Sequence, residues 1–218
     1  RYLWEQLMLP LQCAQHRLDL LHSLGYVGPL MSPCTHVVTV HDANFATLRH
    51  LLAPVRRAVY GFVARRTVMN SQMVITVSEF AKGEIGRAVG TDPGKIRVIP
   101  EGPGWDLTAG PSLDFDKVRQ KYAVPERYVV AFGGGSPHKN LSRMVAAFAE
   151  GCADLPHFLV IIGHLPSDVE SGRRILQLGY LPKEEMLPIL AHADLLVYPS
   201  LYEGFGLPVV EALECGAP

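Results

Sequence analysis

A glycine-rich stretch followed by a lysine is the first place where the residue types could do chemistry. Gly133, Gly134 and Gly135 directly follow an apolar run, and Lys139 comes four residues later. Glycines let a ligand approach the backbone closely, and the beginning of a following helix offers unpaired N–H groups to an anion. Together with the charge of Lys139, this pattern suits a phosphate or diphosphate. A flexible turn with a solvated lysine is an equally good interpretation, and the spacing matches neither a Walker loop nor a dinucleotide-binding fingerprint.

Two glutamates with seven residues between them form the second candidate. Glu203 precedes a glycine-rich segment that ends at Gly206, and Pro208 suits the first turn of a helix that would carry Glu211. Gly206 would then lie at a helix N-terminus, which is another anion-binding arrangement. A carboxylate repels a phosphate, so the natural task of these glutamates is to accept hydrogen bonds from sugar and ribose hydroxyls. The alternative is a turn residue and a surface helix residue.

Both candidate segments follow predicted strands. Short apolar runs rich in β-branched residues occur at 37–40, 73–77, 128–132, 158–162 and 195–198. Most are apolar throughout, as is typical of parallel strands that are covered on both faces. Ligands of open α/β sheets bind at the carboxyl ends of the strands, and the two candidate segments lie there.

The segments between these runs have helical patterns. Apolar residues at helical spacing predict a helix that begins at Leu141, with Asn140 as its N-cap and Gly151 as its end. Ser78 predicts the N-cap of another helix, which ends at Gly90. Strands that alternate with helices predict a doubly wound α/β fold.

The strand and helix pattern breaks between Pro100 and Pro125, where Gly and Pro cluster without a sustained apolar run. Such a stretch is typical of a connection between domains. We therefore expect a first α/β domain at residues 1–107, a linker at 108–127 and a second α/β domain at 128–218. Pro188 predicts either a kink or two short turns within 183–192.

Composition bounds the remaining possibilities. The 218 residues are 48% hydrophobic and 19% charged, which favours a large buried core over disorder. A net charge of −1 gives no overall attraction to nucleic acid or membranes. The four cysteines show no C-x-x-C spacing, so neither a disulfide framework nor a zinc site is expected. No apolar run has transmembrane length, and no signal peptide is recognisable. The chain starts without Met and stops within a pattern, so we expect truncation at both ends.

Two further signals have less support. Asp114 and Asp116 form a D-x-D motif, which binds a metal ion in some enzymes. Here the motif falls in the predicted linker and not at a strand end, so a metal site is not expected. Between Ala43 and Ser78 there is no acidic residue, while five arginines are present: Arg49, Arg56, Arg57, Arg65 and Arg66. A basic amphipathic helix can lie on an anionic membrane. We favour the alternative, a helix whose apolar stripe packs in the core and whose basic face is solvated.

The segment from Ser200 to Pro218 resembles the E-x7-E signature of the retaining glycosyltransferases of family 4, also called group 1. Shorter stretches match in the family's order: His41-Asp42, 76–80, 98–102, Lys139-Asn140-Leu141 and 178–181. The resemblance implies an α/β protein with the glycosyltransferase B (GT-B) architecture. In that architecture two Rossmann-like doubly wound domains face a cleft, and both would be incomplete here.

The resemblance also implies roles for individual residues. Lys139 would hold the donor diphosphate, Glu203 would contact the donor sugar and Glu211 the ribose. His41 would approach the transferred sugar from the first domain. The implied catalytic residues are His41, Lys139 and Glu203. The implied donor-binding residues are Gly133, Gly134, Lys139, Leu181, Glu203, Gly204, Phe205, Gly206, Leu207 and Glu211.

The function implied is transfer of a hexose, with mannose as the first candidate, from a GDP- or UDP-hexose with retention of configuration. The acceptor would be a glycan or a lipid-linked glycan, and no metal, other cofactor or nucleic acid would take part. The expected location is the bacterial cytoplasm, and peripheral contact with an anionic membrane is the less favoured alternative. An inactive nucleotide-sugar-binding module and a sugar-nucleotide epimerase of the same fold are the alternatives. Many family members carry an arginine five or six positions before the lysine, where this chain has Gly134 and Gly133.

Overall fold

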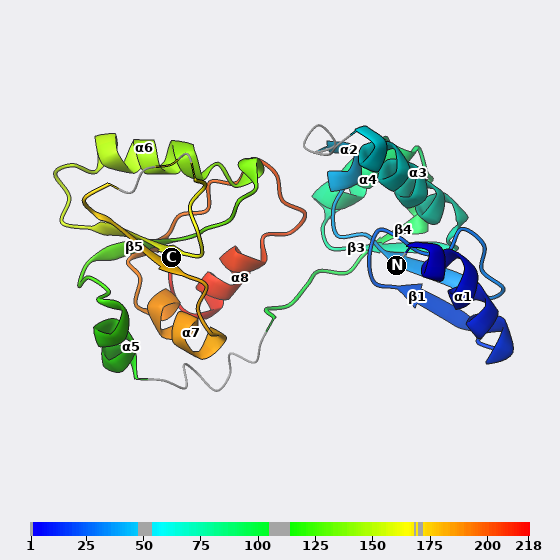
Figure 1. Ribbon diagram of the computed structural model, residues 1–218, viewed down its shortest axis with the longest axis horizontal. Coiled ribbons are helices and arrows are strands. Elements are labelled where there is room, and N and C mark those ends of the chain that lie inside the picture. The colour runs from blue at the N-terminus through cyan, green and yellow to red at the C-terminus, as the bar shows by residue number, and fades with distance from the viewer. Residues whose placement is uncertain (1, 48–53, 105–113, 168, 170–171) are drawn as a thin grey trace. The chain divides into compact units, whose positions relative to one another are not determined.

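The computed structural model describes residues 2–47, 54–104, 114–167, 169 and 172–218 (Figure 1). The chain divides into two compact units, Arg1–Glu101 and Gly102–Pro218. Each unit contains a four-stranded parallel sheet.

The sheet of the first unit has the order β1-β2-β3-β4. Its strands are β1 (Leu20–Ser23), β2 (Thr35–Thr39), β3 (Met73–Thr76) and β4 (Ile96–Val98). Val38 and Val74 are completely buried in neighbouring strands, as expected where helices cover a parallel sheet. The predicted strands at 37–40 and 73–77 are confirmed with slightly different ends.

The helices of the first unit are α1 (Tyr2–Gln15), α2 (Asn44–Thr47), α3 (Pro54–Asn70) and α4 (Glu79–Val89), with a 3-10 turn at Pro93–Lys95. The predicted capping of α4 is confirmed. The Ser78 hydroxyl accepts a hydrogen bond from the Ala81 N–H at 3.0 Å, and Gly90 ends the helix with a left-handed φ of 72°.

The expectation that the apolar stripe of helix α3 packs in the core is wrong for most of its described residues. The helix buries Ala64 and Val68, whereas Val55, Val59 and Phe62 are 78%, 51% and 55% exposed. Arg49 lies outside the described residues, and so do the side chains of Arg56 and Arg57. The outward face of α3 is therefore partly apolar.

The sheet of the second unit has the order β7-β6-β5-β8. Its strands are β5 (Tyr128–Phe132), β6 (Phe158–Ile162), β7 (Ile175–Gly179) and β8 (Leu195–Leu196). The helices are α5 (Phe115–Tyr122), α6 (Leu141–Gly151), α7 (Lys183–Ala191) and α8 (Leu207–Glu214), with a 3-10 turn at Pro137–Lys139. Helix α6 lies on one side of the sheet, and α5 and α7 lie on the other (Figure 1).

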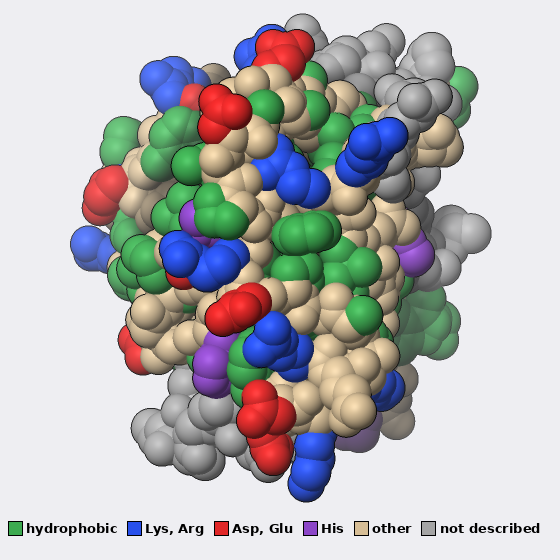
Figure 2. Space-filling model, turned by 90° about the vertical axis from the view of Figure 1, so that its left-hand side faces the viewer, with side chains coloured by type: hydrophobic (Ala, Val, Ile, Leu, Met, Phe, Trp, Pro, Cys, Tyr) green, Lys and Arg blue, Asp and Glu red, His purple; other side chains and the backbone are tan. Residues whose placement is uncertain are grey.

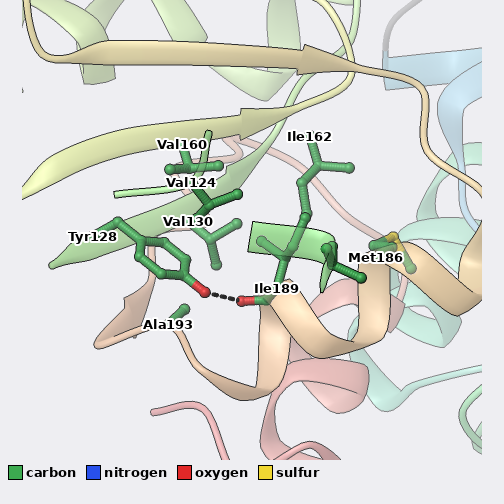
Figure 3. Close-up of a cluster of buried hydrophobic side chains, with 9 residues drawn as sticks. Val124, Tyr128, Val130, Val160, Ile162, Met186, Ile189 and Ala193 are labelled. Carbon is green, nitrogen blue, oxygen red and sulfur yellow. Dashed lines mark hydrogen bonds between the residues drawn. The ribbon is translucent and has the colours of Figure 1, made fainter. Parts of the chain in front are cut away.

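The core between the sheet and α7 contains one buried polar group that is satisfied. Tyr128, Val130 and Val160 of the sheet pack with Met186 and Ile189 of α7 (Figure 3). The Tyr128 hydroxyl donates to the Ile189 carbonyl at 2.7 Å. That carbonyl belongs to the last turn of α7, where helix carbonyls lack intrahelical partners, so Tyr128 fixes the end of α7 to the sheet.

Two local expectations differ from the structure. The segment expected to be a linker, 108–127, contains α5, and the compact units divide between Glu101 and Gly102. The Asp114 carboxylate caps α5 by accepting from the Asp116 N–H, which gives the D-x-D motif a structural role. Pro188 lies inside the single helix α7, which excludes two short turns, and a kink at Pro188 stays a prediction.

Candidate donor-binding site

The two candidate segments of the second unit lie side by side because β5 and β8 are neighbours in the sheet. Residues 133–140 follow β5, and residues 197–206 follow β8. The Asn140 side-chain amide donates to the Pro199 carbonyl at 3.2 Å, and the Leu201 N–H donates to the His138 carbonyl at 2.8 Å. These bonds hold the two loops together at the carboxyl ends of their strands.

Lys139 and Glu203 form an ion pair across these loops. The Lys139 Nζ lies 2.7 Å from Glu203 Oε1 and donates to the Tyr198 hydroxyl at 3.0 Å. The Lys139 and Glu203 side chains are 26% and 27% exposed, so both are shielded from solvent but reachable by a ligand. The structure thus brings together two of the residues that the sequence singled out and adds Tyr198, to which the sequence analysis gave no role.

The ion pair keeps both of its members charged. Burial disfavours the charged form of Lys139, but its hydrogen bonds to Glu203 and Tyr198 outweigh burial and raise the pKa of the ammonium group. Burial likewise disfavours the Glu203 carboxylate, and the hydrogen bond from Lys139 helps to lower the pKa of that carboxyl below its usual value. At neutral pH the pair therefore has two opposite charges and no net charge.

The glycines after β5 differ in their roles. The Gly133 N–H already donates to the Ile162 carbonyl at 2.7 Å, so it is not available to a phosphate, contrary to the expectation. A Cβ at position 133 would lie 2.6 Å from the His164 nitrogen, whereas nothing lies within 4 Å of a Cβ at Gly134. Gly133 is required by the packing of β5 against the backbone after β6, whereas Gly134 and Gly135 face open space.

Glu211 lies on α8, which begins after Gly206, a residue with a left-handed φ of 95°. Glu211 is only 8% exposed. Burial raises the pKa of Glu211, although a backbone hydrogen bond from Gly104 and the charge of Lys183 oppose that rise. Glu211 therefore lies in an environment that disfavours its charge, unlike Glu203.

The remaining predicted donor-binding residues have varied surroundings. Leu181 is partly buried against the core cluster around Tyr128, so its side chain serves the core. Gly204, Phe205 and Leu207 are half-buried, and Gly204 has a further interaction within the chain. These positions lie in the segment that leads into α8.

In the first unit, His41 follows β2 and pairs with a residue that the sequence analysis had given no role. Its Nδ1 lies 2.7 Å from Glu101 Oε1. The neighbouring Asp42 accepts from the Tyr26 hydroxyl at 2.6 Å and from the Asn44 N–H at 2.8 Å. Asp42 therefore has a structural role, and His41 is the side chain of this loop that a substrate could use.

The net charge of −1 is the sum of opposite formal charges on the two units. Residues 1–101 contain eleven Lys and Arg against seven Asp and Glu, a formal charge of +4. Residues 102–218 contain nine against fourteen, a formal charge of −5. On the face shown in Figure 2 the basic and acidic side chains are interspersed, so this face has no continuous field of one sign.

Two other kinds of site are absent from the described part of the chain. No group of three or more His, Cys, Asp and Glu side chains is placed there to hold a metal ion. None of the helices in the described ranges is long and apolar enough to cross a membrane.

Two protein-family models match almost the whole length of this chain. "Glycosyltransferase Family 4" matches residues 1–102, and "Glycosyl transferases group 1" matches residues 114–218. This chain belongs to the group 1, family 4 glycosyltransferases. The expected family is thereby confirmed, and the E-x7-E signature around Glu203 and Glu211 falls within the second match.

Named relatives of this glycosyltransferase include mannosyltransferases. O-antigen chain mannosyltransferase B of Escherichia coli is 29% identical over 195 residues, which cover 84% of this chain and 51% of that protein. MMP alpha-(1→4)-mannosyltransferase of Mycolicibacterium hassiacum is 26% identical over 219 residues, 95% of this chain and 51% of that protein. The chain thus spans about half the length of these relatives.

Solved structures show the same fold. The Anabaena protein HepE, in complex with UDP-glucose, matches with a TM-score of 0.70 and 21% identity over 97% of this chain and 61% of that chain. A likeness at this identity shows the fold alone. It confirms the expected glycosyltransferase B architecture of the glycosyltransferase described here.

Proposed function

We propose that this glycosyltransferase transfers a hexose, with mannose as the first candidate, from a nucleotide-diphospho-sugar to a glycan or lipid-linked acceptor. Two of its relatives are named mannosyltransferases, which supports mannose. A structure of the same fold was solved with UDP-glucose, which supports a nucleotide-diphospho-sugar donor; GDP- and UDP-hexoses are both candidates.

The ion pair between Lys139 and Glu203 is the observation that carries this proposal. Their 2.7 Å contact places a cation and a carboxylate together at the carboxyl ends of two adjacent strands, where open α/β sheets bind ligands. A diphospho-sugar needs both kinds of group, because its phosphates attract a cation and its hydroxyls donate to a carboxylate. Neither charge is fully solvated, which strengthens such contacts.

The proposed reaction asks the protein for positioning and for charge stabilisation. As the bond between sugar and diphosphate breaks, negative charge builds on the leaving diphosphate, and the Lys139 ammonium group and the N-terminus of α8 would stabilise it. The diphosphate would accept the acceptor hydroxyl's proton on the face where the new bond forms. This route gives retention of configuration and requires neither a metal ion nor another cofactor.

Calorimetric titration of the full-length protein with UDP, GDP, ADP and their hexose conjugates tests the donor site. Lys139→Ala and Glu211→Ala should each weaken binding of the preferred donor at least 10-fold, because each removes a proposed donor contact. Lys117→Ala, which removes an exposed lysine of α5, is the matched control and should bind as the parent does. A folded protein that binds none of these nucleotides would contradict the donor-site assignment.

Product analysis separates the enzyme from its alternatives, since one fold supports several functions. A transferase releases a nucleoside diphosphate and lengthens its acceptor. An epimerase changes the sugar of the donor without an acceptor, and an inactive module binds the donor unchanged. NMR coupling at the anomeric carbon of the product tests retention, and activity in excess EDTA tests metal independence.

Peripheral contact with an anionic membrane on the cytoplasmic side of a bacterial cell is the second part of the proposal. The outward face of α3 carries exposed Val59, Phe62 and Met69 beside exposed Arg65 and Arg66. The Arg66 guanidinium lies 5.5 Å above the Phe62 ring. Apolar side chains flanked by arginines fit the boundary between lipid headgroups and acyl chains, and a lipid-linked acceptor would lie at the same boundary.

Sedimentation of the full-length protein with vesicles tests the membrane contact. Binding to vesicles that contain phosphatidylglycerol should exceed binding to phosphatidylcholine vesicles. Replacing Arg65 and Arg66 by Glu should reduce it about 10-fold or more, at about 1 kcal/mol per basic residue. Arg97→Glu, at an exposed position on β4 of the same unit, is the control. An equal loss with Arg97→Glu would point to overall charge and away from α3.

A further inference from the structure

The contact between His41 and Glu101 joins two strand ends that are not neighbours. His41 lies two residues after the end of β2, and Glu101 lies three residues after β4. Strand β3 separates β2 from β4 in the sheet, so this hydrogen bond spans the carboxyl end of β3. The chain between Thr76 and α4 begins at that same end.

The backbone at this edge of the sheet is held firmly. The Val40 N–H donates to the Ile75 carbonyl at 2.8 Å, and the Val40 carbonyl accepts from the Thr76 hydroxyl at 2.7 Å. The Ile99 N–H donates to the Thr76 carbonyl at 2.8 Å. Hydrogen bonds on both sides of β3 therefore fix the backbone from which the His41 and Glu101 side chains start.

The contact defines which ring nitrogen of His41 has a partner. Nδ1 lies 2.7 Å from the Glu101 carboxylate, whereas Nε2 makes no hydrogen bond to a residue in the described ranges. A carboxylate can only accept, so Nδ1 must carry a proton. In the neutral ring Nε2 then has the lone pair and can accept a hydrogen bond.

The pair adds little to stability. The His41 and Glu101 side chains are 43% and 27% exposed, and a polar contact this open to water stabilises the folded state weakly. The pair lies at the carboxyl ends of the strands, where open α/β sheets bind ligands. The contact is therefore placed to orient a ligand-binding side chain.

We propose that Glu101 is a positioning residue for His41. It fixes the proton on Nδ1 and directs Nε2 of His41 to a hydroxyl group of the bound substrate. This inference rests on the proposed function for the identity of that substrate, a sugar or its acceptor. The orientation of the imidazole rests on the 2.7 Å contact alone.

Nitrogen NMR of the full-length protein, labelled with 15N-histidine, reads the tautomer directly. The His41 signals are assigned by their loss in His41→Ala. We expect the parent to show the Nδ1-protonated ring, and Glu101→Ala to show a shift towards the Nε2-protonated form. Glu84→Ala, which breaks another ion pair of the same unit, should leave the His41 signals unchanged. Unchanged His41 signals in Glu101→Ala would overturn the proposal.

Kinetics test whether Glu101 acts through His41. Glu101→Ala should lower kcat by about 10- to 100-fold, as is typical when the partner that orients a functional imidazole is removed, with little change in the donor KM. The double variant with His41→Ala should be no slower than His41→Ala alone. Additive losses would overturn the proposal. Unchanged turnover in His41→Ala would instead contradict the proposed role of His41 in transfer, while the NMR result would still decide the role of Glu101.

Discussion

Lys139 and Glu203 neutralise each other at the place where the proposed donor would put its diphosphate. An arginine five or six positions earlier, common in the family, would give such a site a second positive charge. Here those positions are Gly134 and Gly133, so the proposed site would bind phosphate with one lysine that is already paired with a carboxylate. We therefore expect Glu203 to limit the affinity for the diphosphate.

Glu203→Gln should bind the nucleoside diphosphate more tightly than the parent, by roughly 3- to 10-fold, because Lys139 then has no competing carboxylate. The same variant should lose most of its transferase activity, since the amide is a weaker acceptor for a sugar hydroxyl. Calorimetry and a product assay measure the two effects. Glu150→Gln, at an exposed position on α6, should change neither. Weaker nucleoside diphosphate binding in Glu203→Gln would contradict this account of the ion pair.

Glu211 differs from Glu203, whose pKa is lowered, because burial raises the pKa of Glu211. A carboxyl group whose pKa is raised by folding lowers the free energy of unfolding when it is ionised. This destabilisation disappears as the pH falls through the raised pKa of the folded state and then through the lower pKa of the unfolded state. Glu211→Gln should therefore be more stable than the parent at pH 8, by about 0.5–2 kcal/mol. The difference should shrink towards pH 4. Urea unfolding at several pH values measures it, and a less stable Glu211→Gln at pH 8 would show that the carboxylate is stabilising.

At the scale of elements, the loop after β5 contains a glycine that the sequence places in a ligand site but that the packing of the backbone requires. Gly133 and Gly134 are indistinguishable in the sequence, yet a Cβ at Gly133 would meet the His164 backbone and one at Gly134 would meet open space. The distinction comes from the neighbouring strand β6, which is about 30 residues further along the chain.

Gly133→Ala should destabilise the second unit by roughly 1–3 kcal/mol, because backbone must move to admit the methyl group. Gly134→Ala should fold with nearly the stability of the parent, so any loss of donor binding there reports on the ligand. Thermal unfolding with and without nucleotide compares the two variants. Equal stability of both variants would show that the packing around Gly133 is looser than the contact distances indicate.

Sequence patterns predicted the central strands of each sheet and the edge strand β8, and missed the three other edge strands. The missed strands are β1, β4 and β7. β4 has only three residues, and β1 and β7 are at sheet edges with half-exposed side chains, so none forms an apolar run. Asn140 precedes α6 as predicted, but it has a left-handed φ of 57° and makes no capping bond. Its side chain donates to Pro199 instead, a tertiary contact that local propensity could not reveal.

At the scale of the whole molecule, the sequence indicated two α/β units and candidate residues for a donor site, but not the pairing of those residues. Lys139 and Glu203 are 64 positions apart, and only the adjacency of β5 and β8 explains their contact. The predicted linker contains α5, whose eight residues are too short for a distinctive helical pattern. The role of Glu101 could not be predicted for a related reason, since its partner His41 lies 60 positions away in the sequence.

The division of charge between the units has a consequence for the speed with which a donor is captured. The unit that holds Lys139 and Glu203 has a formal charge of −5, and a nucleotide-diphospho-sugar is itself an anion. Their long-range repulsion slows the encounter, and salt screens it beyond about 10 Å at 0.1 M. Stopped-flow measurements should therefore find an association rate constant that rises with ionic strength, opposite to the behaviour of phosphate sites on basic proteins. A rate constant that falls with salt would mean that local positive charge outweighs the field of the unit. If the rate constant rises as expected, this glycosyltransferase captures its donor fastest in a concentrated ionic medium.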